Sequence, residues 1–171
     1  FHPTDVAEDA DGSLLVVDTG GWFYRGCPTS QLAKPDVRGG IYRVRRRGMT
    51  TQVDPRGNRI DWAQQTNMQL VRLLGDTRFA VRQRAIAQCA SRGQPIVASL
   101  RRTLQRGDIL PRRGAVWALT RIVGRRETSL ALRKSRQLLE ANGDKEAIRL
   151  ALDDRHASVR QAACRSLATY P

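Results

Sequence analysis

Residues 5–18 have the sequence Asp5-Val-Ala-Glu-Asp-Ala-Asp-Gly-Ser-Leu-Leu-Val-Val-Asp18. The tight Asp-Gly turn between two segments of strand-forming character predicts a pair of antiparallel strands. Gly40-Ile-Tyr-Arg-Val-Arg45 alternates apolar and polar residues and predicts a third strand. Three strands cannot bury both of their faces, so we expect this sheet to need neighbouring strands from outside residues 1–48.

The apolar pattern changes to helical spacing from Trp62 onward. Met68, Leu70, Val71 and Leu74 form the first apolar stripe, which ends at Gly75. The further helices are predicted from the sets Val97, Leu100, Leu104; Leu130, Ala131, Leu138, Leu139; and Ala147, Ile148, Ala151, Leu152. Residues 49–61 are polar, contain a Pro-Arg-Gly turn and are predicted to be a linker.

A repeated pattern appears within these helices. Asp76-Thr-Arg-Phe-Ala-Val-Arg82 and Asp154-Arg-His-Ala-Ser-Val-Arg160 share an Asp followed six residues later by Arg, and each has Ala three residues after that Arg. A degenerate third copy places Arg112 and Ala115 in the same register. Because catalysis needs one constellation whereas stacked repeats need one per repeat, we interpret the pairs as a helix-start acid and a stacking arginine.

The formal net charge of +14 resides almost entirely in the helical part. Residues 1–48 contain 7 basic and 6 acidic residues, and residues 49–171 contain the remaining 23 basic and 10 acidic residues. Of the 30 basic residues 27 are arginine. Three explanations stay open: a codon bias towards arginine, which we favour, an anion-binding surface, and pairing of arginines within the repeats.

The candidate site residues lie at or within the long connection between the second and third strands. They are Asp18, Trp22, Cys27 and Lys34. Asp18 could face a ligand, but a carboxylate before Gly-Gly more often caps local backbone amides, and we favour this second role. Trp22 is predicted to anchor the connection, and Cys27 could pair with a residue outside this segment in an oxidising compartment.

The other reactive side chains suggest no catalytic or metal site. The cysteines lack the close spacing of a zinc or haem site, and Cys89 and Cys164 are predicted to be buried thiols. His2 and His156 are single, and a surface role is expected for His156. No apolar run is long enough to predict a membrane-spanning helix.

The segment that ends in Asp18-Thr-Gly-Gly-Trp22, together with Cys27-Pro-Thr-Ser-Gln-Leu-Ala-Lys34 and Gly40-Ile-Tyr-Arg-Val-Arg45, resembles the last β-propeller blade of planctomycete-type membrane-bound dehydrogenases. In that family a propeller similar to quinoprotein glucose dehydrogenase and to NHL repeats is followed by HEAT repeats and a c-type haem domain. The resemblance implies an α+β fragment with a terminal propeller blade of about three antiparallel strands (1–48), a linker (49–61) and HEAT-like helical repeats (62–171). The start at Phe1, without an initiator Met or signal sequence, also suggests a fragment.

The resemblance implies a context and transfers no catalytic residue. The family's Cys-x-x-Cys-His haem motif has no match, so no cofactor is expected here, although the parent would use quinone, calcium and haem c. The expected partners are the remaining blades, a downstream haem domain and a protein bound to the repeats, in the periplasm or at the cell envelope. We expect a non-catalytic structural and interaction segment; the alternative is a basic HEAT-repeat protein that binds nucleic acid.

Overall fold

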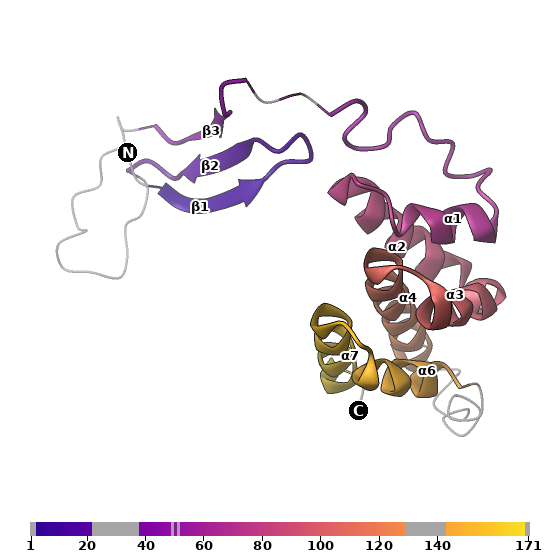
Figure 1. Cartoon of the computed structure of the whole chain (residues 1–171). Coiled ribbons are helices and arrows are strands. Elements are labelled where there is room, and N and C mark those ends of the chain that lie inside the picture. The colour runs from indigo at the N-terminus through magenta and orange to yellow at the C-terminus, as the bar shows by residue number, and fades with distance from the viewer. Residues whose placement is uncertain (1–2, 22–37, 49, 51, 129–142, 170–171) are drawn as a thin grey trace, which may run out of the picture. The chain divides into compact units, whose positions relative to one another are not determined.

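The computed structural model of the chain describes residues 3–21, 38–48, 50, 52–128 and 143–169 (Figure 1). The chain divides into two compact units, Phe1–Arg56 and Gly57–Pro171. The division falls within the predicted linker 49–61. The fold is α+β: the first unit contains a three-stranded antiparallel sheet, and six α-helices are described in the second.

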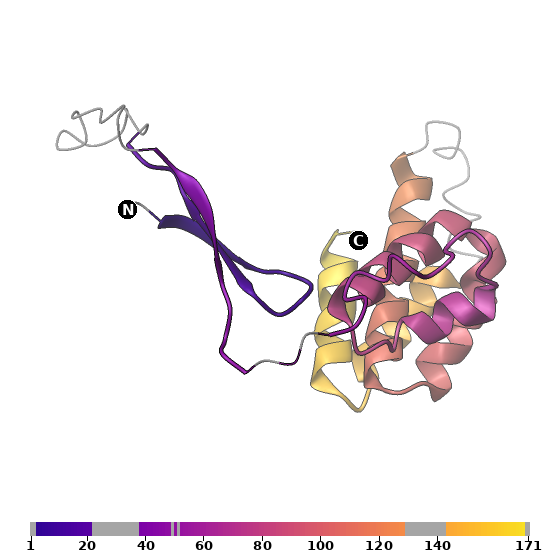
Figure 2. The same ribbon diagram turned by 90° about the horizontal axis from the view of Figure 1, so that it is seen from above.

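The sheet has the strand order β1-β2-β3, formed by β1 (Pro3–Glu8), β2 (Leu14–Asp18) and β3 (Gly40–Val44). The predicted turn between β1 and β2 is present, because Gly12 adopts φ +80° and its amide donates to the Asp9 carbonyl at 2.9 Å. Figure 2 shows the twist of the three strands from a second direction.

The register of the sheet places apolar side chains on both faces. Val16 pairs with Tyr42 and Val6, and on the opposite face Val17 pairs with Ile41. Leu14 and Val16 share one face, whereas Ile41 lies on the other, because its cross-strand partner is Val17. Several large apolar side chains of the sheet are exposed: Val6, Leu14, Ile41, Tyr42 and Val44.

The helices are α1 (Asn67–Leu73), α2 (Phe79–Arg92), α3 (Gln94–Arg106), α4 (Ile109–Thr128), α6 (Asp144–Leu150) and α7 (Ala157–Thr169), with a 3-10 turn η3 (Ala151–Asp153). Their boundaries follow local chemistry. Thr66 and Gln69 form a capping box at the start of α1. Gly93, with φ +64°, separates α2 from α3, and Pro95 lies in the first turn of α3.

The helices pack as consecutive pairs, α1 with α2, α3 with α4 and α6 with α7, which follow one another from top to bottom in Figure 1. Neighbouring pairs contact each other through α2, α4 and α7 in one layer and through α1, α3 and α6 in the other. Small residues lie where the helices approach closely, because Ala85, Ala115 and Ala163 have no exposed surface. The alanine that follows each repeated arginine by three residues is therefore a core residue.

The predicted apolar stripes are confirmed in most positions. Leu70, Leu74, Val97, Leu100 and Ile148 are buried. Met68 is an exception, because its side chain is exposed and lies near the Arg72 guanidinium. The stripe predicted from Leu130 to Leu139 lies outside the described residues.

Candidate interaction surface

Asp18 lies at the end of β2 and is buried, with 5% of its surface exposed. Its Oδ1 accepts a hydrogen bond from the Gly20 amide at 2.8 Å, and Gly20 has φ +65°. This bond confirms that the carboxylate stabilises a local turn. Trp22, Cys27 and Lys34 lie outside the described residues.

A cluster of two carboxylates lies at the β1–β2 turn, where the sequence analysis predicted no site. Arg43 of β3 lies 2.7 Å from Asp9 and 3.2 Å from Asp11, and Arg56 also pairs with Asp9. Hydrogen bonds from Arg43, Arg56 and the Ala10 amide lower the pKa of Asp9 to about 2. Hydrogen bonds from the Ser13 hydroxyl and amide lower the pKa of Asp11. The carboxylates are matched by arginines, so the cluster fastens the turn to β3.

The repeated arginines have one structural role. Arg82 Nη1 donates to the Asp76 and Thr77 carbonyls at 2.6 and 2.8 Å, and Arg160 Nη1 donates to the Asp154 carbonyl at 2.8 Å. Arg112 Nη1 donates in the same way to the Gly107 carbonyl at 2.8 Å. In each case the arginine reaches back from the first turns of its helix to the turn that precedes the helix.

The repeated aspartates also have one role in their own turns. Asp76 Oδ1 accepts from the Arg78 amide, and Asp154 Oδ1 accepts from the His156 amide, both at 2.8 Å. Hydrogen bonding by the Arg78 side chain is the main cause that lowers the pKa of Asp76. These carboxylates are held in Asx turns, which supports their interpretation as helix-start acids.

The described thiols and histidine do not form a reactive group. Cys89 is buried, and burial raises the pKa of its thiol to about 12, which removes the thiolate at neutral pH. Cys164 is exposed, which corrects the prediction that both thiols are buried. His156 caps α7, because its Nδ1 lies 2.8 Å from the Ser158 hydroxyl and 3.3 Å from the Ser158 amide.

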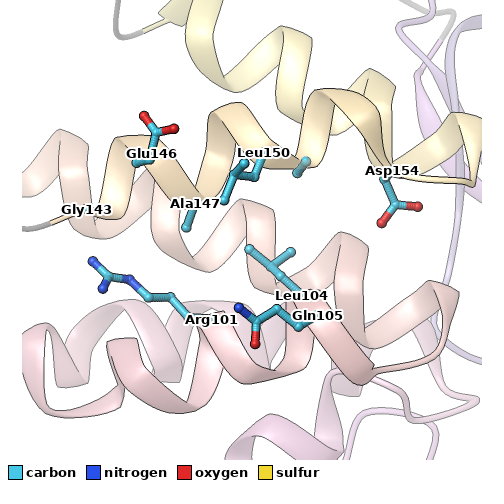
Figure 3. Close-up of a pocket in the computed structure, with 9 residues that line it drawn as sticks. Arg101, Leu104, Gln105, Gly143, Glu146, Ala147, Leu150 and Asp154 are labelled. Carbon is cyan, nitrogen blue, oxygen red and sulfur yellow. The ribbon is translucent and has the colours of Figure 1, made fainter.

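An apolar pocket lies between α3 and the α6–η3 segment (Figure 3), with a volume of about 490 Å³. Leu104 from α3 and Ala147 and Leu150 from α6 point into the space between the two helices. Arg101 lies at one end, where its Nη2 donates to the buried Asp144 carboxylate at 2.8 Å. Asp144 neutralises the charge of Arg101 at this end of the pocket. The rest of the lining is mainly apolar.

A second depression, which we call the arginine groove, crosses α2, α4 and α7 and has a volume of about 260 Å³. Each helix supplies one face with the spacing i, i+3, i+4, i+7. The faces are Phe79, Arg82, Gln83, Ile86 of α2; Leu110, Arg113, Gly114, Trp117 of α4; and Ser158, Gln161, Ala162, Arg165 of α7. Three helices from three pairs therefore each present one face to the same surface.

The arginine groove is cationic and partly aromatic. Among the described residues that line it, Arg82, Arg113 and Arg165 are charged and none is acidic. Burial, reinforced by the charge of Arg113, lowers the pKa of Arg82. The Arg82 guanidinium lies 5.7 Å from the centre of the Phe79 ring, whose side chain is 60% exposed. Such a surface is suited to bind anionic groups that carry apolar neighbours.

Sequence reasoning did not identify the arginine groove. The repeated pattern nevertheless pointed to the relevant part of each helix, because the residues that line the groove lie close to Arg82, Arg112 and Arg160 in the sequence. The step that was missing is the placement of α2, α4 and α7 in one layer, which depends on tertiary packing.

Comparisons with known proteins gave no match to a protein-family model, to a curated protein or to a solved structure. Within the described ranges, no three His, Cys, Asp or Glu side chains are grouped as metal ligands would be. None of the described helices is both long enough and apolar enough to span a membrane.

Proposed function

We propose that this chain is a non-catalytic structural and interaction segment of a larger protein. In this proposal residues 62–171 form a HEAT-like repeat scaffold, and residues 1–48 form the end of a β-propeller. The parent would be a periplasmic dehydrogenase-like haem protein, as the sequence resemblance implies. The helical repeats would hold partner domains in place, and the chemistry would belong to other parts of the parent.

The observation that carries the proposal is the threefold recurrence of one contact. Arg82, Arg112 and Arg160 each bond a carbonyl of the turn that precedes their helix. These helices are the second members of successive pairs and form one layer. A structural device that recurs once per pair supports a repeat array, because such arrays are stabilised by equivalent contacts within and between neighbours.

The exposed sheet supports the propeller part of the proposal. Val6 and Ile41 are 60% and 72% exposed on opposite faces, and Leu14, Tyr42 and Val44 are also exposed. An apolar surface of this kind on a three-stranded sheet is stable when another sheet packs on it. Neighbouring propeller blades would supply that sheet.

The positions of the cations favour a scaffold over a nucleic-acid-binding protein. Many described arginines contact groups of their own fold, as Arg101 contacts Asp144, Arg112 contacts Asp154 and Arg92 contacts the Gln65 carbonyl. Arg84 lies over the Trp62 ring at 4.7 Å. These contacts give part of the arginines a structural role within the fold that needs no polyanionic ligand.

An exchange of repeat turns tests the proposal. We would replace residues 76–82 by the sequence of residues 154–160, which keeps the Asp, Val and Arg of the pattern and changes the four residues between Asp76 and Val81. If the turns are equivalent repeat elements, the chimera folds cooperatively with the helix content of the original chain. Far-UV circular dichroism and thermal unfolding measure both properties.

A matched control uses the same exchange with Arg82→Gln. It should unfold at a lower temperature than the chimera, because the turn carbonyls lose their donor. A chimera that loses its cooperative transition, or a control that unfolds at the same temperature, would count against the repeat scaffold.

A further inference from the structure

The arginine groove differs from the other cationic parts of the fold in having no described acidic lining residue. Arg78 pairs with Asp76 at 2.8 Å, and Arg112 pairs with Asp154 at 2.9 Å, which leaves these guanidiniums neutralised. In the groove, by contrast, Arg82 and Arg113 come from adjacent helices. Burial is the main cause that lowers the pKa of Arg82, and repulsion by the charge of Arg113 adds to it. An anion that enters the groove would relieve this repulsion.

The remaining lining indicates what else the ligand contains. Gln83 and Gln161 are exposed, and their amides can both donate and accept hydrogen bonds, as a peptide backbone requires. Trp117 is half-buried and Phe79 exposed, and they offer apolar contact beside the charges. A volume of about 260 Å³ accommodates a few side chains.

The extent of the charge favours a peptide over nucleic acid. Nucleic acid binding draws its affinity from many phosphates along an extended basic track. Here the arginines that line the groove are three, and the neighbouring Arg112 is paired with the Asp154 carboxylate. A few carboxylates on a short segment match this number of guanidiniums.

We propose that the arginine groove binds an acidic segment of a protein partner, whose carboxylates pair with Arg82, Arg113 and Arg165 and whose apolar side chains contact Phe79 and Trp117. This inference rests on the proposed function, because it names the kind of partner that the repeat scaffold holds.

The test measures binding of a short fluorescein-labelled peptide, with glutamates on both sides of a central leucine, to the full chain by fluorescence anisotropy. The peptide should bind, and the same peptide with glutamine in place of glutamate should bind at least about tenfold more weakly. Single-stranded and duplex DNA of similar charge serve as competing probes.

Matched variants locate the binding. Arg113→Gln with Arg165→Gln should weaken peptide binding by at least about tenfold, since each loss removes a charge-assisted pair. Arg102→Gln with Arg106→Gln removes the same charge from exposed positions on α3 and should change the affinity less than about threefold. Because Arg113 is half-buried, Arg165→Glu provides a second variant at an exposed position, and circular dichroism verifies the fold of each.

Three results would overturn the inference: no binding of the acidic peptide, equal weakening by the groove and α3 variants, or DNA that binds more tightly and depends on the groove arginines. None of these results affects the turn-exchange experiment, because that experiment tests the repeat scaffold by folding alone. Loss of cooperative folding in the chimera with peptide binding intact in the original chain would reject the scaffold and retain the groove.

Discussion

Arg112 and Asp154 lie 42 positions apart in the sequence and face each other inside the helical unit. Arg112 Nε lies 2.9 Å from Asp154 Oδ2, and Arg112 Nη2 donates to Oδ1 at 3.0 Å. Their side chains are 4% and 10% exposed. A guanidinium at this depth depends on its carboxylate partner, because an unpaired buried charge is strongly disfavoured.

We therefore expect Asp154→Asn to lower the free energy of unfolding by about 3–5 kcal/mol, measured by urea denaturation. The asparagine retains the oxygen that accepts from the His156 amide, so the change isolates the loss of the ion pair. Arg160→Met serves as the comparison: Arg160 is exposed and bonds a carbonyl, and its loss should cost about 1 kcal/mol. Equal losses in both variants would contradict a special role of the buried pair.

The close approach of the helices predicts intolerance of larger side chains at the small core positions. Ala115 and Ala163 have no exposed surface, so Ala115→Leu or Ala163→Leu should destabilise the helical unit by about 1–3 kcal/mol. Arg102→Ala, at an exposed position of α3, should stay within about 0.5 kcal/mol. Thermal and urea unfolding both measure the difference, and an unchanged Ala163→Leu variant would show that α7 is not tightly packed.

The aspartates of the β1–β2 turn predict a pH dependence. The arginines lower the pKa of Asp9 from 3.8 to about 2, so their stabilising effect is complete above about pH 4 and is lost as the pH falls through 2. A carbon-13 titration of the Asp9 carboxyl should show a midpoint near 2. Arg43→Gln should move this midpoint upwards, and a midpoint that does not move would contradict the contact with Arg43.

The cysteines should differ in their reactivity towards iodoacetamide. Cys164 is exposed and should be alkylated in the folded chain, whereas Cys89 is buried with a pKa of about 12 and should be protected. Peptide mass spectrometry reads each site separately, before and after the addition of urea. Protection of Cys164 in the folded chain would indicate that a second surface covers α7.

The chain should show no dehydrogenase activity when quinone cofactor, calcium, a panel of sugars and a dye acceptor are supplied. It should also take up no haem covalently, because its sequence lacks the Cys-x-x-Cys-His motif. Absorbance of the dye and the intact mass of the protein check these two expectations, with a quinoprotein glucose dehydrogenase as positive control. Cofactor-dependent dye reduction would reject the non-catalytic proposal.

Local patterns in the sequence were sufficient to predict the strands and to identify the recurring positions of Asp and Arg in the helical part. The turn at Gly12 depends on a positive φ that glycine adopts freely, and this is visible in the dipeptide Asp11-Gly12. The contacts of Arg82 and Arg160 depend on a six-residue spacing within one turn and one helix. Such short-range geometry is fixed by the chain itself.

Features that depend on distant parts of the chain could not be predicted. The exposure of Cys164 follows from the packing of α7 through Val159, Ala162, Ala163 and Ser166, which turns residue 164 away from α4. The position of Ile41 follows from the hydrogen-bond register between β2 and β3, and a shift by one residue would reverse its face. The arginine groove likewise needs three helices to be placed side by side.

Asp154 connects two neighbouring pairs of helices, since it holds Arg112 of α4 and also accepts from the His156 amide in the turn that starts α7. Local opening of the α6–α7 pair would leave the Arg112 guanidinium in an apolar interior without its counter-charge. Fraying of this pair is therefore penalised by its neighbour, and amide protons of α4 and α7 should exchange with solvent as one cooperative unit. The Asp154 carboxylate thus couples local unfolding of the α6–α7 pair to the stability of α4.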